Sequence, residues 1–155
     1  MPATTRLSVL LTDWESLLQS WAADGSLSAA ALTALGLPEE SRQLQDLRQR
    51  LAQGIRADLP GVELLSAEAM GGALGAYASG SGTIYLNEDW LAGAEDRAAL
   101  AVLTEELGHH LDAVLNTADT PGDEGAVFSQ LLLGCLLYTS PSPRDLSTSR
   151  MPSSA

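Results

Sequence analysis

The chain has little cysteine, little positive charge and no long apolar segment. Its single cysteine, Cys135, excludes an intramolecular disulfide and a zinc site built from several thiolates. Eight basic against 20 acidic side chains leave a formal net charge of -12, which repels the phosphates of nucleic acids. No segment reaches the ~18 consecutive apolar residues of a membrane-spanning helix. We therefore expect neither a nucleic-acid partner nor membrane insertion.

The N-terminus also lacks the pattern of a classical secretion signal. One arginine precedes a short apolar run that Asp13 and Glu15 interrupt, and this run is too short for the apolar region of a signal peptide. Export of the protein would therefore need a non-classical route.

The first 57 residues have the pattern of a helical segment. Thr12 and Glu15 have the spacing of a capping box, which predicts the start of a first helix. A second helix is predicted to end at Gly36, and a third to begin at Pro38. We interpret the apolar side chains of these helices as core, the alternative being a docking module for a partner. They recur at helical spacing: Trp14, Leu17, Leu18, Trp21, Leu44, Leu47 and Leu51.

Residues 58–134 combine strand and helix patterns, and we expect them to form a truncated domain. A strand is predicted at 62–65, and two further apolar runs on either side of 80–82 predict a β-hairpin with a flexible tip. A short turn is expected around Trp90, and leucines at helical spacing predict the strongest helix over 95–116. The expected fold is α+β, with a helical N-terminal part, a small antiparallel sheet and a long helix that carries the candidate site.

The last segment, 135–155, differs in kind from the rest. It is rich in serine and proline and has no hydrophobic periodicity, which predicts disorder. It also resembles a read-through of adapter or vector sequence, which implies that the native protein continues beyond Gly134. A genuine flexible tail is the alternative.

Both histidines of the chain lie among several carboxylates in the sequence TEELGHHLD. Because a helix advances about 100° per residue, Glu105, His109 and Asp112 are predicted to share one helix face. Imidazole nitrogens and carboxylate oxygens are zinc ligands, and a separation of one helical turn lets two of them converge on one ion. The pattern therefore predicts a divalent metal site.

The spacing Glu105-Glu106-x-x-His109 is that of the zincin motif H-E-x-x-H with glutamate in place of the first histidine. The second residue of that motif takes a proton from metal-bound water, so Glu106 is the predicted general base. A further ligand is expected from Glu124 or Asp123, at the start of the next helix. Asp112 is expected to orient His109 or to substitute as a ligand. Zinc is the first candidate, but the extra carboxylate makes a harder site, which also suits calcium or manganese.

These residues have structural interpretations as well. A solvated acidic helix face, with Glu106 and His110 paired one turn apart, would explain the cluster. Asp123 and Glu124 could offset the positive end of a helix. Gly108 is harder to explain in this way, because glycine inside a helix costs about 1 kcal/mol relative to alanine, and close packing over the site would justify it. His110 is predicted to be a bystander that points away from the ion.

The segment from about Ala57 to Gly134 resembles a domain of large bacterial calcium-binding repeat proteins of the haemolysin type. The likeness is carried by GTIYLNEDWL, EELGHHLD and DTPGDEGAVF. It implies a zincin-like metallopeptidase domain of a secreted or cell-surface protein, acting on a protein or peptide substrate. The hairpin predicted before the motif helix agrees with a zincin-like domain, because an edge strand beside the cleft can hold an extended substrate. The alternatives are an inactive calcium- or metal-binding module of an adhesin-like protein and a purely structural cap.

Overall fold

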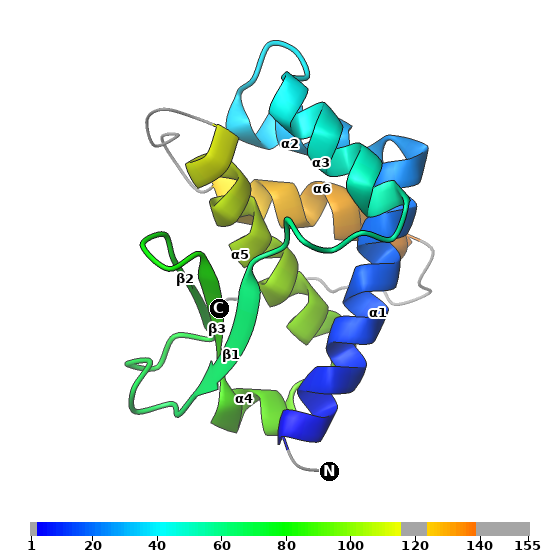
Figure 1. Ribbon diagram of the computed structural model, residues 1–155. Coiled ribbons are helices and arrows are strands. Elements are labelled where there is room, and N and C mark those ends of the chain that lie inside the picture. The colour runs from blue at the N-terminus through cyan, green and yellow to red at the C-terminus, as the bar shows by residue number, and fades with distance from the viewer. Residues whose placement is uncertain (1–2, 116–123, 139–155) are drawn as a thin grey trace.

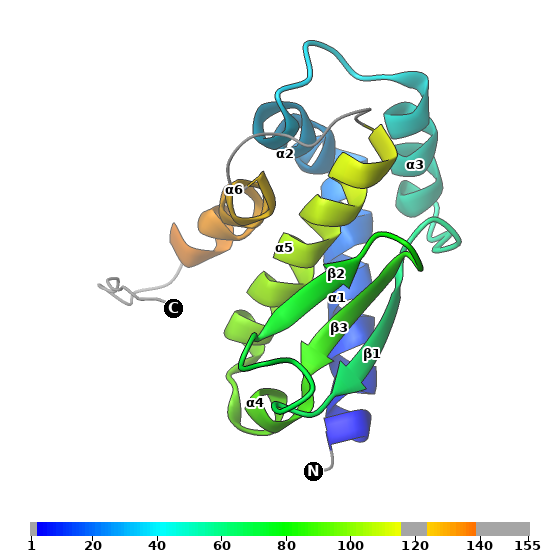
Figure 2. The same ribbon diagram turned by 90° about the vertical axis from the view of Figure 1, so that its left-hand side faces the viewer.

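The computed structural model describes residues 3–115 and 124–138 and has the expected α+β fold. The motif-bearing helix α5 lies between a small sheet on one side and helices α1 and α6 on the other (Figures 1 and 2). In chain order the elements are α1 (Ala3–Asp24), α2 (Ser26–Leu35), α3 (Arg42–Ala52), β1 (Gly61–Leu65), β2 (Gly75–Ala78), β3 (Thr83–Asn87), α4 (Glu88–Gly93), α5 (Asp96–Leu115) and α6 (Glu124–Tyr138).

The starts of the first and third helices differ from the expectation. Helix α1 already begins at Ala3, so Thr12 is not a cap, and its hydroxyl donates a hydrogen bond to a carbonyl one turn earlier. Helix α3 begins after Ser41, whose side chain accepts a hydrogen bond from the Leu44 amide, and not at Pro38. The end of α2 at Gly36 is confirmed, with this glycine in the left-handed conformation at φ 65°.

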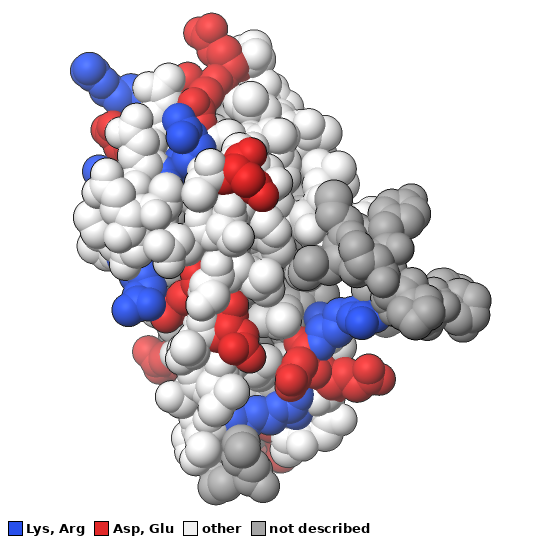
Figure 3. All heavy atoms as spheres, turned by 90° about the vertical axis from the view of Figure 1, so that its right-hand side faces the viewer, with Lys and Arg blue, Asp and Glu red and all other residues white. Residues whose placement is uncertain are grey.

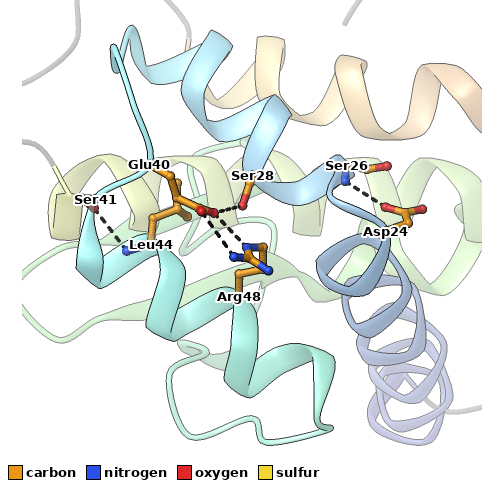
Figure 4. Close-up of polar contacts among 7 residues, drawn as sticks. All are labelled: Asp24, Ser26, Ser28, Glu40, Ser41, Leu44 and Arg48. Atoms are coloured by element: carbon orange, nitrogen blue, oxygen red, sulfur yellow. Dashed lines mark hydrogen bonds and ion pairs between the residues drawn. The ribbon is translucent and has the colours of Figure 1, made fainter.

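Polar contacts of Glu40 fix the connection between α2 and α3 (Figure 4). Its carboxylate accepts hydrogen bonds from the Ser28 hydroxyl and from Nε and Nη2 of Arg48, the latter two at 2.8 and 3.3 Å. The Arg48 hydrogen bond, followed by that from Ser28, lowers the pKa of Glu40. At the other end of α2, the Asp24 carboxylate accepts a hydrogen bond from the Ser26 amide at 2.8 Å. Both contacts hold α2 at a fixed angle to its neighbours.

The sheet has the strand order β1-β3-β2. The hairpin is confirmed, because β2 pairs with β3 in the antiparallel sense. The expectation of a wholly antiparallel sheet is wrong, because β1 pairs with β3 in parallel. The reason is that segment 66–74 crosses from the end of β1 to the opposite edge of the sheet, where β2 runs back. Strand β3 then lies between β1 and β2 and runs in the direction of β1. The sheet is therefore mixed, and β2 is one of its edges.

The two elements that follow the sheet are helices α4 and α5. Around Trp90 the chain forms the short helix α4 where a turn was expected. Asn87 ends β3 and caps α4, since its side-chain oxygen accepts a hydrogen bond from the Trp90 amide at 3.0 Å. The long helix expected over 95–116 is confirmed as α5. Its leucines are buried from Leu103 to Leu111, whereas Val114 is exposed.

One hydrophobic core joins the first and last elements of the described chain, which confirms that the apolar faces of the N-terminal helices are core. Helix α1 packs on α5, and α2 packs on α6. A buried hydrogen bond of 3.2 Å from Nε1 of Trp14 to Oγ1 of Thr104 joins α1 to α5. The largest fully buried side chains are Trp14, Phe128, Leu10, Leu18, Leu27, Leu44, Ile84, Leu86, Leu91, Leu103, Leu107 and Leu111.

The surface and the chain ends add two observations. Acidic and basic side chains are interspersed on the face shown in Figure 3, which is the right-hand side of Figure 1. Of the helices in the described ranges, none is both long and apolar enough to span a membrane. Helix α6 continues to Tyr138, into the segment expected to be a tail, and the remainder of that segment lies outside the described residues.

Candidate metal centre

Three side chains of α5 form a group that could hold a metal ion. One carboxylate oxygen each from Glu105 and Glu106 and one imidazole nitrogen from His109 all lie within 4.8 Å of one another. Glu105 and His109 are one helical turn apart, which explains why the two side chains meet. The structure thus brings together two of the predicted ligands, and it places the predicted general base, Glu106, in the same group.

One member of this group is buried, whereas Glu105 and His109 are partly exposed. Glu106 is only 6% exposed and Asp112, further along α5, only 5% exposed. A solvated acidic face therefore does not describe Glu106 and Asp112. Buried carboxylates cost free energy unless they are hydrogen-bonded, paired with a cation or bound to a metal. The sequence alone, with acids on two adjacent positions, could not distinguish these situations.

Glu124, the first residue of α6, holds the imidazole of His109. Its Oε1 lies 2.8 Å from Nδ1 of His109, and its side chain is 9% exposed. An ionised carboxylate only accepts hydrogen bonds, so the tautomer that matches it carries the proton on Nδ1 and leaves Nε2 as the electron-pair donor. Carboxylates that orient metal-bound histidines make this type of contact. The predicted role of Glu124 as a direct ligand stays a prediction.

Two glycines allow α6 to approach α5 at this point. A Cβ atom on Gly108 would lie 2.9 Å from Cα of Gly125 and 3.1 Å from Cβ of Phe128. A Cβ atom on Gly125 would lie 2.5 Å from the carbonyl oxygen of Glu105 and 2.8 Å from Nε2 of His109. Close packing thus explains the glycine inside α5, as expected from its cost in a helix. The same contact brings the start of α6 over His109 and the backbone of Glu105.

The edge strand β2 covers another side of the group. A Cβ atom on Gly75 would lie 2.5 Å from Cγ1 of Val102 and 3.3 Å from Cγ of Glu106. Strand β2 therefore rests directly on the helix face that carries Glu106. Gly75 was not among the predicted site residues, although a glycine within a strand pattern often marks a close approach of two backbones.

The other predicted site residues lie outside the three-residue group that the described chain contains. Asp112 is buried on α5, and its role as a ligand stays a prediction. Asp123 lies outside the described residues. The group found here has two carboxylates and one imidazole, so it favours oxygen-preferring ions more than a site with several histidines would.

His110 has partners outside the group of Glu105, Glu106 and His109, and its predicted bystander role stays a prediction. Its Nδ1 lies 2.8 Å from the hydroxyl of Tyr77 on β2, and the two rings meet edge to face with centroids 5.4 Å apart. Burial lowers the pKa of His110, and a hydrogen bond to the backbone of Asp58 partly opposes this effect. The contact with Tyr77 has no signal in the sequence, because it depends on how β2 lies on α5.

Comparison with known proteins adds no relative: no family model, no curated protein and no solved structure matches this chain. The resemblance to haemolysin-type repeat proteins therefore rests on its motifs alone. What the chain can do has to be inferred from the chemistry of the group on α5.

Proposed function

We propose that this domain is a metal-dependent, peptidase-like hydrolase. The observation that carries the proposal is the group on α5, in which ligand atoms of Glu105, Glu106 and His109 lie within 4.8 Å of one another. In this proposal Glu105 and His109 bind the ion and Glu106 acts as general base. Asp112 and the acids at 123 and 124 are candidates for completing or supporting the ligand set.

The proposed chemistry follows from the properties of these side chains. A divalent ion bound here would raise the acidity of water and polarise a carbonyl group. Glu106 would accept the proton of the attacking water, and its low exposure of 6% would keep bulk water from competing for the carboxylate. Glu124 would keep the imidazole of His109 in one orientation through the 2.8 Å contact with Nδ1. Zinc is the proposed ion, with manganese and calcium as alternatives.

A protein or peptide is the proposed substrate. Strand β2 lies on the helix face that carries Glu106 and is an edge of the three-stranded sheet. An extended peptide can add to such an edge through main-chain hydrogen bonds, which would bring a peptide bond close to Glu106. The resemblance to haemolysin-type repeat proteins extends the proposal to a secreted or cell-surface location, reached by a non-classical route.

A second candidate function is that of an inactive module that binds calcium for stability. Two of the three donors in the group are carboxylates, and calcium takes only oxygen ligands, mostly six to eight of them. This function requires neither a general base nor access for a peptide. The two candidates therefore differ in what the carboxylate of Glu106 does.

Metal binding and peptide hydrolysis test the proposal separately. Zinc, manganese and calcium are titrated calorimetrically into the parent, into Glu105→Gln and Glu106→Gln, and into Glu95→Gln as a control that removes the same charge from an exposed position. We expect one ion per chain in the parent and the control, and binding at least tenfold weaker in Glu105→Gln.

Hydrolysis of a mixed peptide library is then followed by mass spectrometry. Loss of a general base typically costs a factor of about 10² to 10⁴, so Glu106→Gln should bind the ion and lose hydrolysis. An ion bound by a parent that cleaves nothing would favour the calcium module. A parent that binds none of the three ions would refute both functions.

A further inference from the structure

A second candidate site lies between α3 and α5, next to His110, and its lining contains none of the three residues of the candidate metal centre. It is a pocket of about 290 Å³, close to the lower limit of about 300 Å³ for ligand sites, which suits one side chain better than a whole small molecule. It lies away from Glu105, Glu106 and His109. Its lining includes Asp46, Leu47 and Arg50 of α3, Asp58 after α3, and His110 and Val114 of α5.

The charges in this pocket favour a cation. The guanidinium of Arg50 is already bound to Asp58, with Nε–Oδ2 and Nη2–Oδ1 distances of 2.5 and 3.1 Å. Asp46 is exposed. Within the described residues its side chain makes neither a hydrogen bond nor an ion pair, although its charge acts on Arg50 at longer range. One positive and two negative charges leave the pocket with an excess negative charge, carried by Asp46.

The remaining walls suit an aliphatic chain. Leu47 and Val114 face the pocket with apolar side chains from α3 and α5. Both polar ends of the His110 ring have partners, since Nδ1 contacts Tyr77 and the ring also hydrogen-bonds to the backbone of Asp58. A ligand with a long apolar stem and a positive end would match this combination of an apolar wall and one acidic group.

The pocket lies in line with the candidate metal centre. Glu106, His110 and Val114 follow one another at four-residue spacing, so they form one row along α5 with steps of about 6 Å. Strand β2 already matches this row, because Gly75 faces Glu106 and Tyr77 contacts His110. Two residues of an extended chain span about 6.6 Å. A peptide that adds to the free edge of β2 in this register would have its peptide bond next to Glu106. A side chain two residues further along would then lie near the pocket.

We propose that this pocket binds a lysine- or arginine-like side chain of the peptide substrate. Its place in a reaction rests on the proposed hydrolase function, whereas the binding of a basic side chain does not. The inference therefore names a substrate class: peptides with a long basic residue two positions from the cleaved bond.

Binding is tested without added metal, by NMR titration of isotope-labelled protein with N-acetyl-lysine amide. N-acetyl-norleucine amide is the matched ligand, because it has the same stem without the ammonium group. The signals to follow are the His110 ring and the methyl groups of Leu47 and Val114. Asp46→Asn removes the proposed partner, and Asp13→Asn removes the same charge from an exposed position on α1.

We expect saturable shifts with the lysine amide, several-fold weaker binding of the norleucine amide, and a roughly two- to fivefold loss of lysine affinity in Asp46→Asn alone. Equal affinity for both ligands, or shifts that leave the three pocket residues unmoved, would overturn the proposal. Lysine binding in a chain that binds no metal would support the pocket while refuting the hydrolase. Hydrolysis with no preference for basic residues would overturn the pocket and leave the hydrolase standing.

Discussion

Replacing Gly125 with alanine should disrupt the contact on which the geometry of the candidate metal centre depends. The added Cβ atom would lie 2.5 Å from the carbonyl oxygen of Glu105 and 2.8 Å from Nε2 of His109. The first of these atoms belongs to the backbone of α5 and cannot move by a rotamer change. Helix α6 must therefore shift away from α5, and the hydrogen bond between Glu124 and His109 must lengthen.

The size of this effect can be worked out from the overlap. Insertion of a methyl group into a close-packed contact typically costs about 1–3 kcal/mol. For a chain of this length, each kcal/mol lowers the melting temperature by about 2–4 °C, so we expect a decrease of about 2–12 °C in a thermal melt followed by circular dichroism. The affinity for a metal ion should also fall by about 10- to 100-fold, as it does when a carboxylate that supports a ligand is lost.

The assay combines urea denaturation followed by circular dichroism with calorimetric titration of zinc or manganese. Gly93→Ala is the matched control, because a Cβ atom at Gly93 would meet nothing within 4 Å. The control should retain the stability and the metal affinity of the parent. If Gly125→Ala were as stable as Gly93→Ala, α6 could not cross α5 at Gly108 and Gly125 as described.

Three further substitutions test other parts of the structure. Thr104→Val should lower the free energy of unfolding by about 1–3 kcal/mol in urea denaturation, because it leaves a buried tryptophan N–H without its acceptor; an unchanged value would contradict this hydrogen bond. Glu40 has a lowered pKa, so its ionised form stabilises the fold above its ordinary value of 4.5, and this contribution is lost as the pH falls through the folded pKa. Stability curves of Glu40→Gln should therefore fall less steeply on acidification than those of the control Glu39→Gln, and parallel curves would refute the effect. Gly75→Ala should destabilise the protein by about 1–3 kcal/mol, because its methyl group would overlap Val102, whereas Gly61→Ala, with nothing within 4 Å, should not; equal stability would show that β2 does not rest on α5.

Local signals predicted the elements that depend on neighbouring residues. Leucines at helical spacing identified α5 to within a residue at each end, and the glycine at position 36 marked the end of α2. The hairpin of β2 and β3 was equally visible, because two apolar runs joined by a short glycine-containing turn pair most simply with each other. These features require no knowledge of the rest of the chain.

Features that depend on distant segments were not predictable in the same way. The parallel pairing of β1 with β3 follows from the course of residues 66–74, and strand patterns do not encode direction. The capping-box pattern at Thr12 was misleading, because good helix formers before it let α1 start at Ala3. Local sequence also could not place Ser41, rather than Pro38, at the start of α3.

The part of the candidate site that lies on one helix was predictable, whereas the contacts between elements were not. The four-residue spacing of Glu105 and His109 on one helix fixes their proximity, and it needs no tertiary contact. The contact between Glu124 and His109 depends on the crossing of α5 and α6. The indications for this crossing in the sequence were Gly108 and the further ligand expected from position 123 or 124. The place of Tyr77 beside His110 required the sheet to be known.

The hydrogen bond between Trp14 and Thr104 has a consequence for the synthesis of the protein on the ribosome. Its two residues are 90 positions apart, so at about 5–20 residues per second α1 emerges roughly 5–20 s before its partner on α5 exists. During this interval the leucines and tryptophans on the inner face of α1 have no complete core to enter. Nascent chains stalled before α5 should therefore recruit chaperones or aggregate, whereas chains released after α6 can bury the same side chains at once.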